Sequence, residues 1–249
     1  MTVKDLLKRS KTIVSFVHTL RGFGYRRMAR AEGPPFNGDQ ILTRTVDFLL
    51  TGCDVNSFIE TGTYLGYTCR YVASRYPHLP VSTVESNPNF FNPSQSVLRQ
   101  YANVKSILGD SAVTVSQLVR EGIKGVPLFF LDAHWYDYLP LPDEIRSIGN
   151  NLTDAIMVIH DFQVPGKDYG FDICHGQAIG MKMLIANIDR SKNYQVYFPN
   201  YTYEQAYNVR PKLNQQLRGY AIVFQEVGEA AERFAASEHV QWFVRGDLQ

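Results

Sequence analysis

The segment Val55–Gly66, V-N-S-F-I-E-T-G-T-Y-L-G, decides how the rest of the sequence is interpreted. It begins as a short apolar stretch, reaches the acid Glu60, and then contains Gly62 and Gly66. A helix-like stretch, Tyr67–Arg75, follows directly. A strand that runs through a glycine turn into a helix N-terminus is how parallel α/β proteins bind nucleotide-like ligands. The pattern predicts a cofactor-binding turn, although a tight strand–helix junction without a ligand would use the same glycines.

Strand-like and helix-like stretches alternate on both sides of this turn. Asp39–Leu50 is expected to form a helix with Asp39 as its cap. Strands are expected over Val55–Glu60, Val81–Glu85, Val104–Leu108, Val126–Leu131, Ala155–Ile159, Tyr194–Phe198 and Tyr220–Gln225. The intervening helices are expected over Tyr67–Arg75, Pro93–Tyr101, Ser111–Arg120, Pro142–Asn150 and Gln177–Ile188. This order predicts an α/β fold with a doubly wound, mostly parallel, seven-stranded sheet.

Composition indicates an ordinary globular protein. The chain has 249 residues, 45% hydrophobic content and a formal net charge of +1. Such a balance favours neither nucleic acid nor a membrane surface as partner. No apolar run reaches the roughly 18 residues that span a bilayer, so we expect no stable membrane insertion and a cytoplasmic location. The three cysteines do not form a disulfide framework.

The first 38 residues are expected to be a helical extension, and residues 39–249 the main domain. Basic residues of the first thirty positions face only Asp5: Lys4, Lys8, Arg9, Lys11, Arg21, Arg26, Arg27 and Arg30. This charge is typical of a solvated helix face, and the alternative is a basic cap for an anionic substrate or partner. A homodimer through these N-terminal helices is a further expectation.

Two acids narrow the choice of ligand. Glu60 would repel a pyrophosphate, and its turn is E-x-G-x-x-x-G rather than G-x-G-x-x-G, which counts against NAD. It favours a ligand with a positive amino group. Glu85 ends the second strand, close to the distance of about 20 residues at which a ribose-binding acid follows such a turn. Asp110, in L-G-D-S, could accept from an adenine amino group or cap the next helix.

A second group of polar residues follows the fourth and fifth expected strands. F-L-D-A-H-W supplies Asp132 and His134, and V-I-H-D-F supplies His160 and Asp161. In a parallel sheet both strand ends open onto one crevice, so these side chains should converge. Carboxylates with imidazole suit Mg²⁺ or Mn²⁺. His134 could instead act as a general base, and either histidine alone could be an ordinary buried side chain.

Neighbouring segments could complete a substrate site. Aromatic residues after Asp132, which include Tyr138, form a wall or pack in the core. Phe90 or Phe91 lies near an adenine ring, or the segment around them simply turns the chain. Two inserts rich in aromatic and polar residues, Gln163–His175 and Asn200–Arg218, are expected where such folds bind substrate.

In their order, I-E-T-G-T-Y-L-G, V-E-S-N, L-G-D-S and F-L-D-A-H-W resemble the class I S-adenosylmethionine-dependent methyltransferases. The resemblance covers roughly Asp39–Phe162, and the late strands are compatible with that family's reversed seventh strand. Within the class, the Asp132 and His160–Asp161 arrangement is similar to that of the metal-dependent small-molecule O-methyltransferases of the macrocin and catechol types. The sequence departs from those enzymes at His160 and His134, where acids are more usual.

The resemblance implies a role for each matching position. Glu60 and Gly62 would lie near the amino acid end of S-adenosylmethionine, Glu85 on its ribose, and Asp110 with Ser111 near its adenine. The full cofactor-binding set is Glu60, Thr61, Gly62, Thr63, Gly66, Glu85, Ser86, Asp110, Ser111 and Asp132. The metal set is Asp132, His160 and Asp161, and the catalytic pair is Asp132 and His134.

The expected function is therefore transfer of a methyl group to the hydroxyl of a small molecule, such as a sugar, a phenol or a natural product, with help from Mg²⁺ or Mn²⁺. Two alternatives stay open. One is a metal-dependent hydrolase that uses the Asp/His cluster around an activated water. The other is a non-catalytic family member that binds a nucleotide.

Overall fold

The computed structural model describes residues 24–31, 33–133, 138–212 and 215–247. Most of the expected N-terminal extension, and His134 with its neighbours up to 137, lie outside these residues. No helix in the described ranges is both long enough and apolar enough to cross a membrane.

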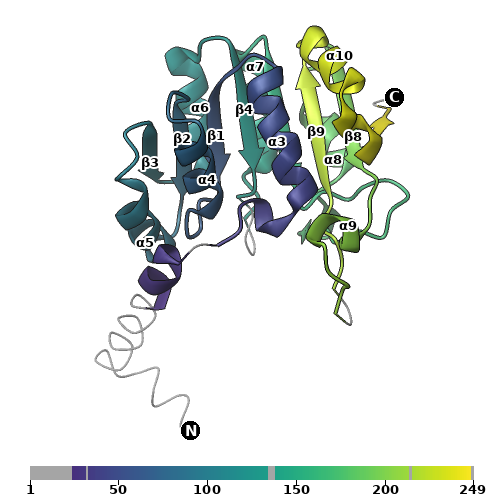
Figure 1. The fold of residues 1–249 in the computed structure, drawn as a ribbon. Coiled ribbons are helices and arrows are strands. Elements are labelled where there is room, and N and C mark those ends of the chain that lie inside the picture. Colours follow the sequence, from purple (N-terminus) through teal and green to yellow (C-terminus); the bar gives the residue numbers. More distant parts are fainter. Residues whose placement is uncertain (1–23, 32, 134–137, 213–214, 248–249) are drawn as a thin grey trace, which may run out of the picture.

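The centre of the molecule is one twisted sheet with helices on both faces (Figure 1). Its order is β10-β8-β9-β5-β4-β1-β2-β3. The strands are β1 (Val55–Thr61), β2 (Val81–Glu85), β3 (Val104–Leu108), β4 (Val126–Leu131), β5 (Ala155–His160), β8 (Tyr194–Pro199), β9 (Tyr220–Gln225) and β10 (Phe243–Gly246). Strands β1 to β5 run parallel, whereas β9 runs antiparallel to both of its neighbours, β5 and β8. The reversed late strand is thus confirmed.

The sheet among the described residues has eight strands, so the expected number of seven was wrong. The additional strand, β10, pairs antiparallel with β8 at the edge of the sheet. Its sequence, F-V-R-G, is too short to show an alternating pattern, and only Phe243 of its four residues is buried. A short edge strand of this kind carries almost no signal in sequence.

Two hydrophobic clusters hold the helices against the sheet. One face carries α3 (Gln40–Gly52), α4 (Tyr67–Arg75), α5 (Pro88–Leu98) and α10 (Gly228–Ala236), and the other α6 (Ser111–Gly122), α7 (Leu141–Asn151) and α8 (Met181–Asn187). Successive strand residues serve opposite faces: Phe58 packs in the first cluster and Ile59 in the second. This alternation is the period of two that a strand imposes. Both faces are therefore covered, as a doubly wound sheet requires.

Two helices begin at other residues than expected. Helix α5 starts at Pro88 rather than Pro93, because Asn87 accepts a hydrogen bond from the Asn89 N–H as N-cap and proline fits the first turn. The helix expected from Gln177 starts only at Met181. The residues before it pair as a hairpin, β6 (Ile173–Cys174) with β7 (Gln177–Ala178).

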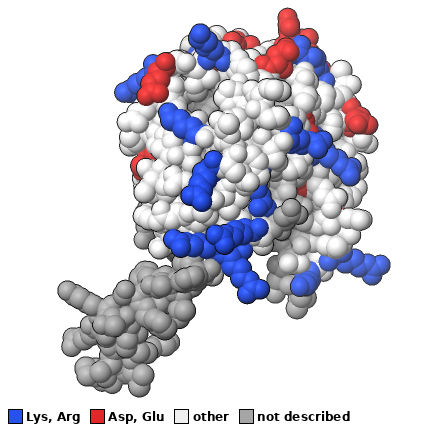
Figure 2. Space-filling view, turned by 60° about the vertical axis from the view of Figure 1, so that its left-hand side comes forward, with Lys and Arg blue, Asp and Glu red and all other residues white. Residues whose placement is uncertain are grey.

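Residues 24–30 form a helical turn that docks beside α4 and α5 (Figure 1). The Tyr67 hydroxyl donates to the Met28 carbonyl, and the Arg70 guanidinium donates to the Ala31 carbonyl. Arg26, Arg27 and Arg30 stay exposed there. Figure 2 shows basic side chains spread over the upper, middle and lower parts of this side of the molecule, with acidic ones mainly near its upper edge.

Candidate active site

The glycine turn after β1 brings β1 and β4 into close contact. Gly62 has φ +84°, and a Cβ there would lie 2.6 Å from the backbone oxygen of Asp132. Its N–H donates to the Val84 carbonyl on β2. Gly66, at φ +80°, is the N-cap of α4. Since both positions require positive φ, and Gly62 also lacks space for a side chain, glycine is needed for the geometry of this turn.

Glu60 lies beneath the turn and is 2% exposed. The Thr83 hydroxyl donates to its carboxyl group, and the hydroxyls of Thr63 and Thr83 are in contact. When Glu60 is ionised, Thr83 gives it its only proton, and Thr63 is then the donor in the second contact. Burial raises the pKa of Glu60 to about 8, despite the Thr83 hydrogen bond, which lowers it. The structure thus holds a carboxyl group that is easily protonated below the glycine turn.

A cavity of about 270 Å³ opens at the carboxyl ends of β1, β2 and β3. It contains five of the residues expected to bind a cofactor: Gly62, Glu85, Ser86, Asp110 and Ser111. Its other lining residues are Tyr64, Val84, Asn87, Phe90, Gly109, Ala133, Tyr138 and Pro140. The remaining members of the expected set are not on its wall: Glu60, Thr61, Thr63, Gly66 and Asp132.

Glu85 is the acid best placed to bind a ligand in this cavity. Oε2 accepts from the Tyr64 N–H and Oε1 from the Asn87 N–H, both at 2.8 Å. Burial raises the pKa of this carboxyl group, and the backbone N–H groups oppose the rise. Since each carboxylate oxygen can accept more than one hydrogen bond, the fixed carboxylate can still accept from two ligand hydroxyls.

Asp110 caps a helix and also lies on the cavity wall. Its Oδ1 accepts from the Val113 N–H at the start of α6, so it is a helix cap, and it also lines the cavity. Burial and a hydrogen bond to Asp110 raise the pKa of Tyr138 to about 12. Phe90 lines the same cavity and packs 4.8 Å from the Tyr64 ring, whereas Phe91 is buried.

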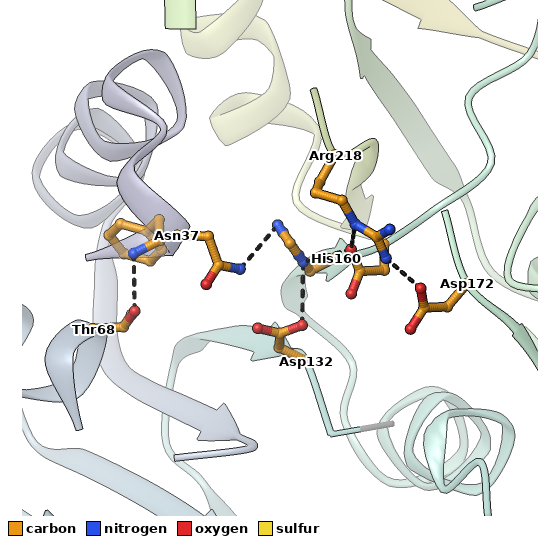
Figure 3. A network of polar contacts seen from close by, with 8 residues as sticks. Asn37, Thr68, Asp132, His160, Asp172 and Arg218 are labelled. Carbon is orange, nitrogen blue, oxygen red and sulfur yellow. Dashed lines mark hydrogen bonds and ion pairs between the residues drawn. The ribbon is translucent and has the colours of Figure 1, made fainter. Parts of the chain in front are cut away.

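Three members of the second group of polar residues, Asp132, His160 and Asp161, meet where β4 and β5 end (Figure 3). His160 Nδ1 lies 3.2 Å from Asp132 Oδ1 and 3.3 Å from Asp161 Oδ1. Its Nε2 lies 3.5 Å from Asn37 Nδ2. Burial alone would lower the pKa of His160, but the two nearby carboxylates raise it to about 10. The structure thus brings together the three residues expected to bind a metal.

The donor set fits a divalent cation. One donor atom from each of Asp132, His160 and Asp161 lies within 4.8 Å of the others. Atoms about 2.1 Å from a cation in octahedral geometry are about 3 Å apart, close to the two Nδ1–oxygen distances. Nδ1 is buried and faces both carboxylates, so it can offer a lone pair to a metal once His160 has lost the proton that they favour. Asp161 has φ 55°, an uncommon backbone conformation of the kind found at functional sites.

Sequence reasoning missed two side chains that contact this group, Arg218 and Asn37, and a third, Asp172, that pairs with Arg218. The Arg218 guanidinium bonds Asp161 through Nε and Asp172 through a terminal nitrogen, and Asn37 approaches His160. Burial would lower the pKa of Arg218, but these two carboxylates raise it above its ordinary value. Asp172 and Arg218 belong to the two inserts expected to bind substrate. The sequence therefore indicated the segments that contain these two residues, but not the residues themselves.

Comparison with known proteins finds likeness only at the level of structure. No protein-family model matches the chain, and no curated protein matches it by sequence. A protein from Klebsiella pneumoniae, provisionally described as an O-methyltransferase, aligns over 84% of this chain and 89% of its own with a TM-score of 0.51 and 13% identity. EvdMO1 aligns over 80% of this chain with a TM-score of 0.45 and 14% identity, and the chain spans 46% of its length.

A methyltransferase from Geobacter sulfurreducens aligns over 87% of this chain and 96% of its own, with a TM-score of 0.47 and 12% identity. Together with the strand order and the reversed β9, the first alignment identifies the fold. The chain has the class I methyltransferase fold, a doubly wound sheet extended by one edge strand.

Proposed function

We propose that this protein is an S-adenosylmethionine-dependent methyltransferase that acts on the hydroxyl of a small molecule. The observation that supports this most is the position of the cavity. It extends from Glu85 and Asp110 at the ends of β2 and β3 to Gly62 and Ala133 at the ends of β1 and β4. Ala133 directly follows Asp132, so one end of the cavity lies beside the Asp/His cluster.

The lining residues suit an adenosyl ligand. Glu85, held by two backbone N–H groups, would accept from both ribose hydroxyls. Asp110 would accept from the adenine amino group, with Phe90 against the ring. Glu60 lies behind Gly62, where the amino acid end of the ligand would come. A bound ammonium group would favour the ionised form of Glu60 and lower its pKa from about 8.

The chemistry would fall to the residues at the other end of the cavity. When bound, S-adenosylmethionine supplies an electrophilic methyl group, and a divalent cation lowers the pKa of a hydroxyl that it contacts. Asp132, Asp161 and neutral His160 would hold that cation. The proton of the acceptor hydroxyl needs a base, and His134 remains the sequence-based prediction for it. Catalysis would rest mainly on placing the acceptor oxygen in line with the methyl group.

Calorimetry with S-adenosylhomocysteine, the demethylated cofactor product, tests the cofactor part of this proposal. We expect one site per chain, and Glu85→Ala should weaken binding by about 10- to 100-fold, because hydrogen bonds to a charged group contribute about 1.5–3 kcal/mol. Glu121→Ala, on the exposed part of α6, is the matched control and should bind as wild type does. No binding at millimolar ligand would sink the proposal.

Glu85→Ala also distinguishes the proposed function from the two alternatives. A metal-dependent hydrolase needs no adenosyl ligand, so Glu85→Ala would leave its activity unchanged. A non-catalytic nucleotide-binding protein would bind S-adenosylhomocysteine and lose that affinity in Glu85→Ala, but it would not transfer a methyl group from labelled cofactor to any member of a sugar and phenol panel.

A further inference from the structure

Arg218 lies against the same carboxylate that the metal set uses. Its Nε donates to Asp161 Oδ1, the very atom that lies 3.3 Å from His160 Nδ1 (Figure 3). A terminal nitrogen of the guanidinium donates to Asp172 Oδ1. The fork of one arginine therefore bridges two carboxylates, and one of them belongs to the candidate metal site.

The backbone fixes Arg218 at this place. The Gly219 carbonyl accepts from the Phe162 N–H, next to Asp161, and the Leu217 carbonyl accepts from the Gly170 N–H. Asp172 is fixed to the same site, since its N–H donates to the Asp161 carbonyl. Substitution of Gly170 would crowd the arginine, because a Cβ there would lie 3.1 Å from Arg218 Cδ. Backbone hydrogen bonds between the end of β5 and the segments beside it thus fix Arg218 together with its two carboxylate partners, Asp161 and Asp172.

Binding a guanidinium and a divalent cation to Asp161 Oδ1 at the same time costs free energy. Like charges repel strongly at contact distance where water is scarce, and the Asp161 side chain is only 14% exposed. Asp172 is more open, at 43%, and Arg218 is 35% exposed. Asp172 can therefore keep the guanidinium paired after it leaves Asp161, so that no buried charge is left without a partner.

We propose that Arg218 is a competing internal cation, which occupies Asp161 when no metal is bound and moves to Asp172 alone when a divalent cation binds. This inference rests on the metal part of the proposed function. Arg218 acts through Asp161 and is a positioning residue for the metal site. Its competition sets the metal concentration at which the site fills.

Titration of the full chain with MnCl₂ alone, by calorimetry and by the electron paramagnetic resonance signal of free Mn²⁺, tests the proposal. Arg218→Met should bind Mn²⁺ at least tenfold more tightly than wild type. Arg218→Lys, which keeps the charge but loses the fork, should fall between them. Arg210→Met, an exposed arginine of the same insert, should leave the affinity unchanged. In the Arg218→Met background, Asp161→Asn should abolish the binding.

If Arg218 instead helped to bind the metal, or only stabilised the fold, Arg218→Met would weaken Mn²⁺ binding or leave it unchanged. Mn²⁺ binding in Arg218→Met that is equal to, weaker than or as absent as in wild type overturns the proposal, as does binding that survives Asp161→Asn. If Arg218→Met does not fold, judged by circular dichroism, Arg218→Lys decides by the same rule. S-adenosylhomocysteine titrated into the same samples tests the cofactor separately, so a failure there does not count against Arg218.

Discussion

The two halves of the candidate site both present carboxylates, but to different kinds of partner. At the ends of β2 and β3, Glu85 and Asp110 are held by backbone N–H groups, which are neutral. At the ends of β4 and β5, Asp132 and Asp161 face His160 and Arg218, which carry or can carry positive charge.

This difference indicates what each half can exchange. Carboxylates held by neutral donors keep their charge and their remaining lone pairs for ligand groups such as hydroxyls and amines. Carboxylates already paired with cations bind another cation at a free-energy cost, because the like charges repel. The first half is suited to hold a ligand with little rearrangement, whereas our proposal for Arg218 has the second release a guanidinium when a metal binds.

The largest effect is expected at Gly62, where the two halves touch. Gly62→Ala places a Cβ at φ +84° and 2.6 Å from the Asp132 backbone oxygen. Backbone strain and overpacking should together cost about 2–4 kcal/mol of the free energy of unfolding and abolish S-adenosylhomocysteine binding. Thermal unfolding and calorimetry measure the two effects. Gly228→Ala is the control, since nothing lies within 4 Å of its Cβ position; equal stability of the two variants would contradict the packing argument.

The second-largest effect is expected at Asp161, where a substitution should weaken metal binding but not cofactor binding. Asp161→Asn should lower the affinity for Mn²⁺ by about 100-fold or more, because an anionic ligand is lost. It should change the affinity for S-adenosylhomocysteine by less than about twofold, since Asp161 does not line the cofactor cavity. Titrations with each ligand measure the split, and a parallel loss of both affinities would mean that the halves are one coupled site.

The smallest effect concerns Glu60 and depends on pH. Its pKa is about 8 in the folded protein against an ordinary value of 4.5. Between these values the unfolded chain loses a proton that the folded protein keeps, so this group makes stability fall as pH rises. Glu60→Gln removes that loss, so its Tm should exceed that of wild type near pH 9 and equal it near pH 4.

The same variant should bind S-adenosylhomocysteine more weakly than wild type, because it cannot become an anion. The exposed Glu121→Gln is the control, with no expected shift at either pH. A Glu60→Gln protein that is less stable than wild type at pH 9 would show that the ionised carboxylate supports the fold, contrary to its burial.

Sequence reasoning succeeded for the strands with the clearest hydrophobic pattern. The apolar run Val126–Leu131 forms the buried strand that was expected, and Glu60, Glu85 and Asp132 lie at or next to the carboxyl ends of the parallel strands β1, β2 and β4. It failed for α5, where proline suggested a helix start at Pro93 although the structure places Pro93 inside the helix. It also missed β10, whose pairing with β8 depends on tertiary contact more than on pattern.

The candidate site was predictable in part for the same reason. Asp132, His160 and Asp161 meet because parallel strands end at one edge, which periodicity alone implies. Arg218 and Asp172 come from inserts with no regular period, and their meeting depends on the backbone pairing of Gly170 with its partners beside β9. No spacing in sequence encodes that contact.

A crystal structure of the protein with S-adenosylhomocysteine tests the central claim most directly. The account predicts the ligand in the cavity, with both ribose hydroxyls on Glu85, the adenine between Phe90 and Asp110, and the sulfur near Ala133. A ligand bound elsewhere, or a cavity without it at saturating concentration, would contradict the account.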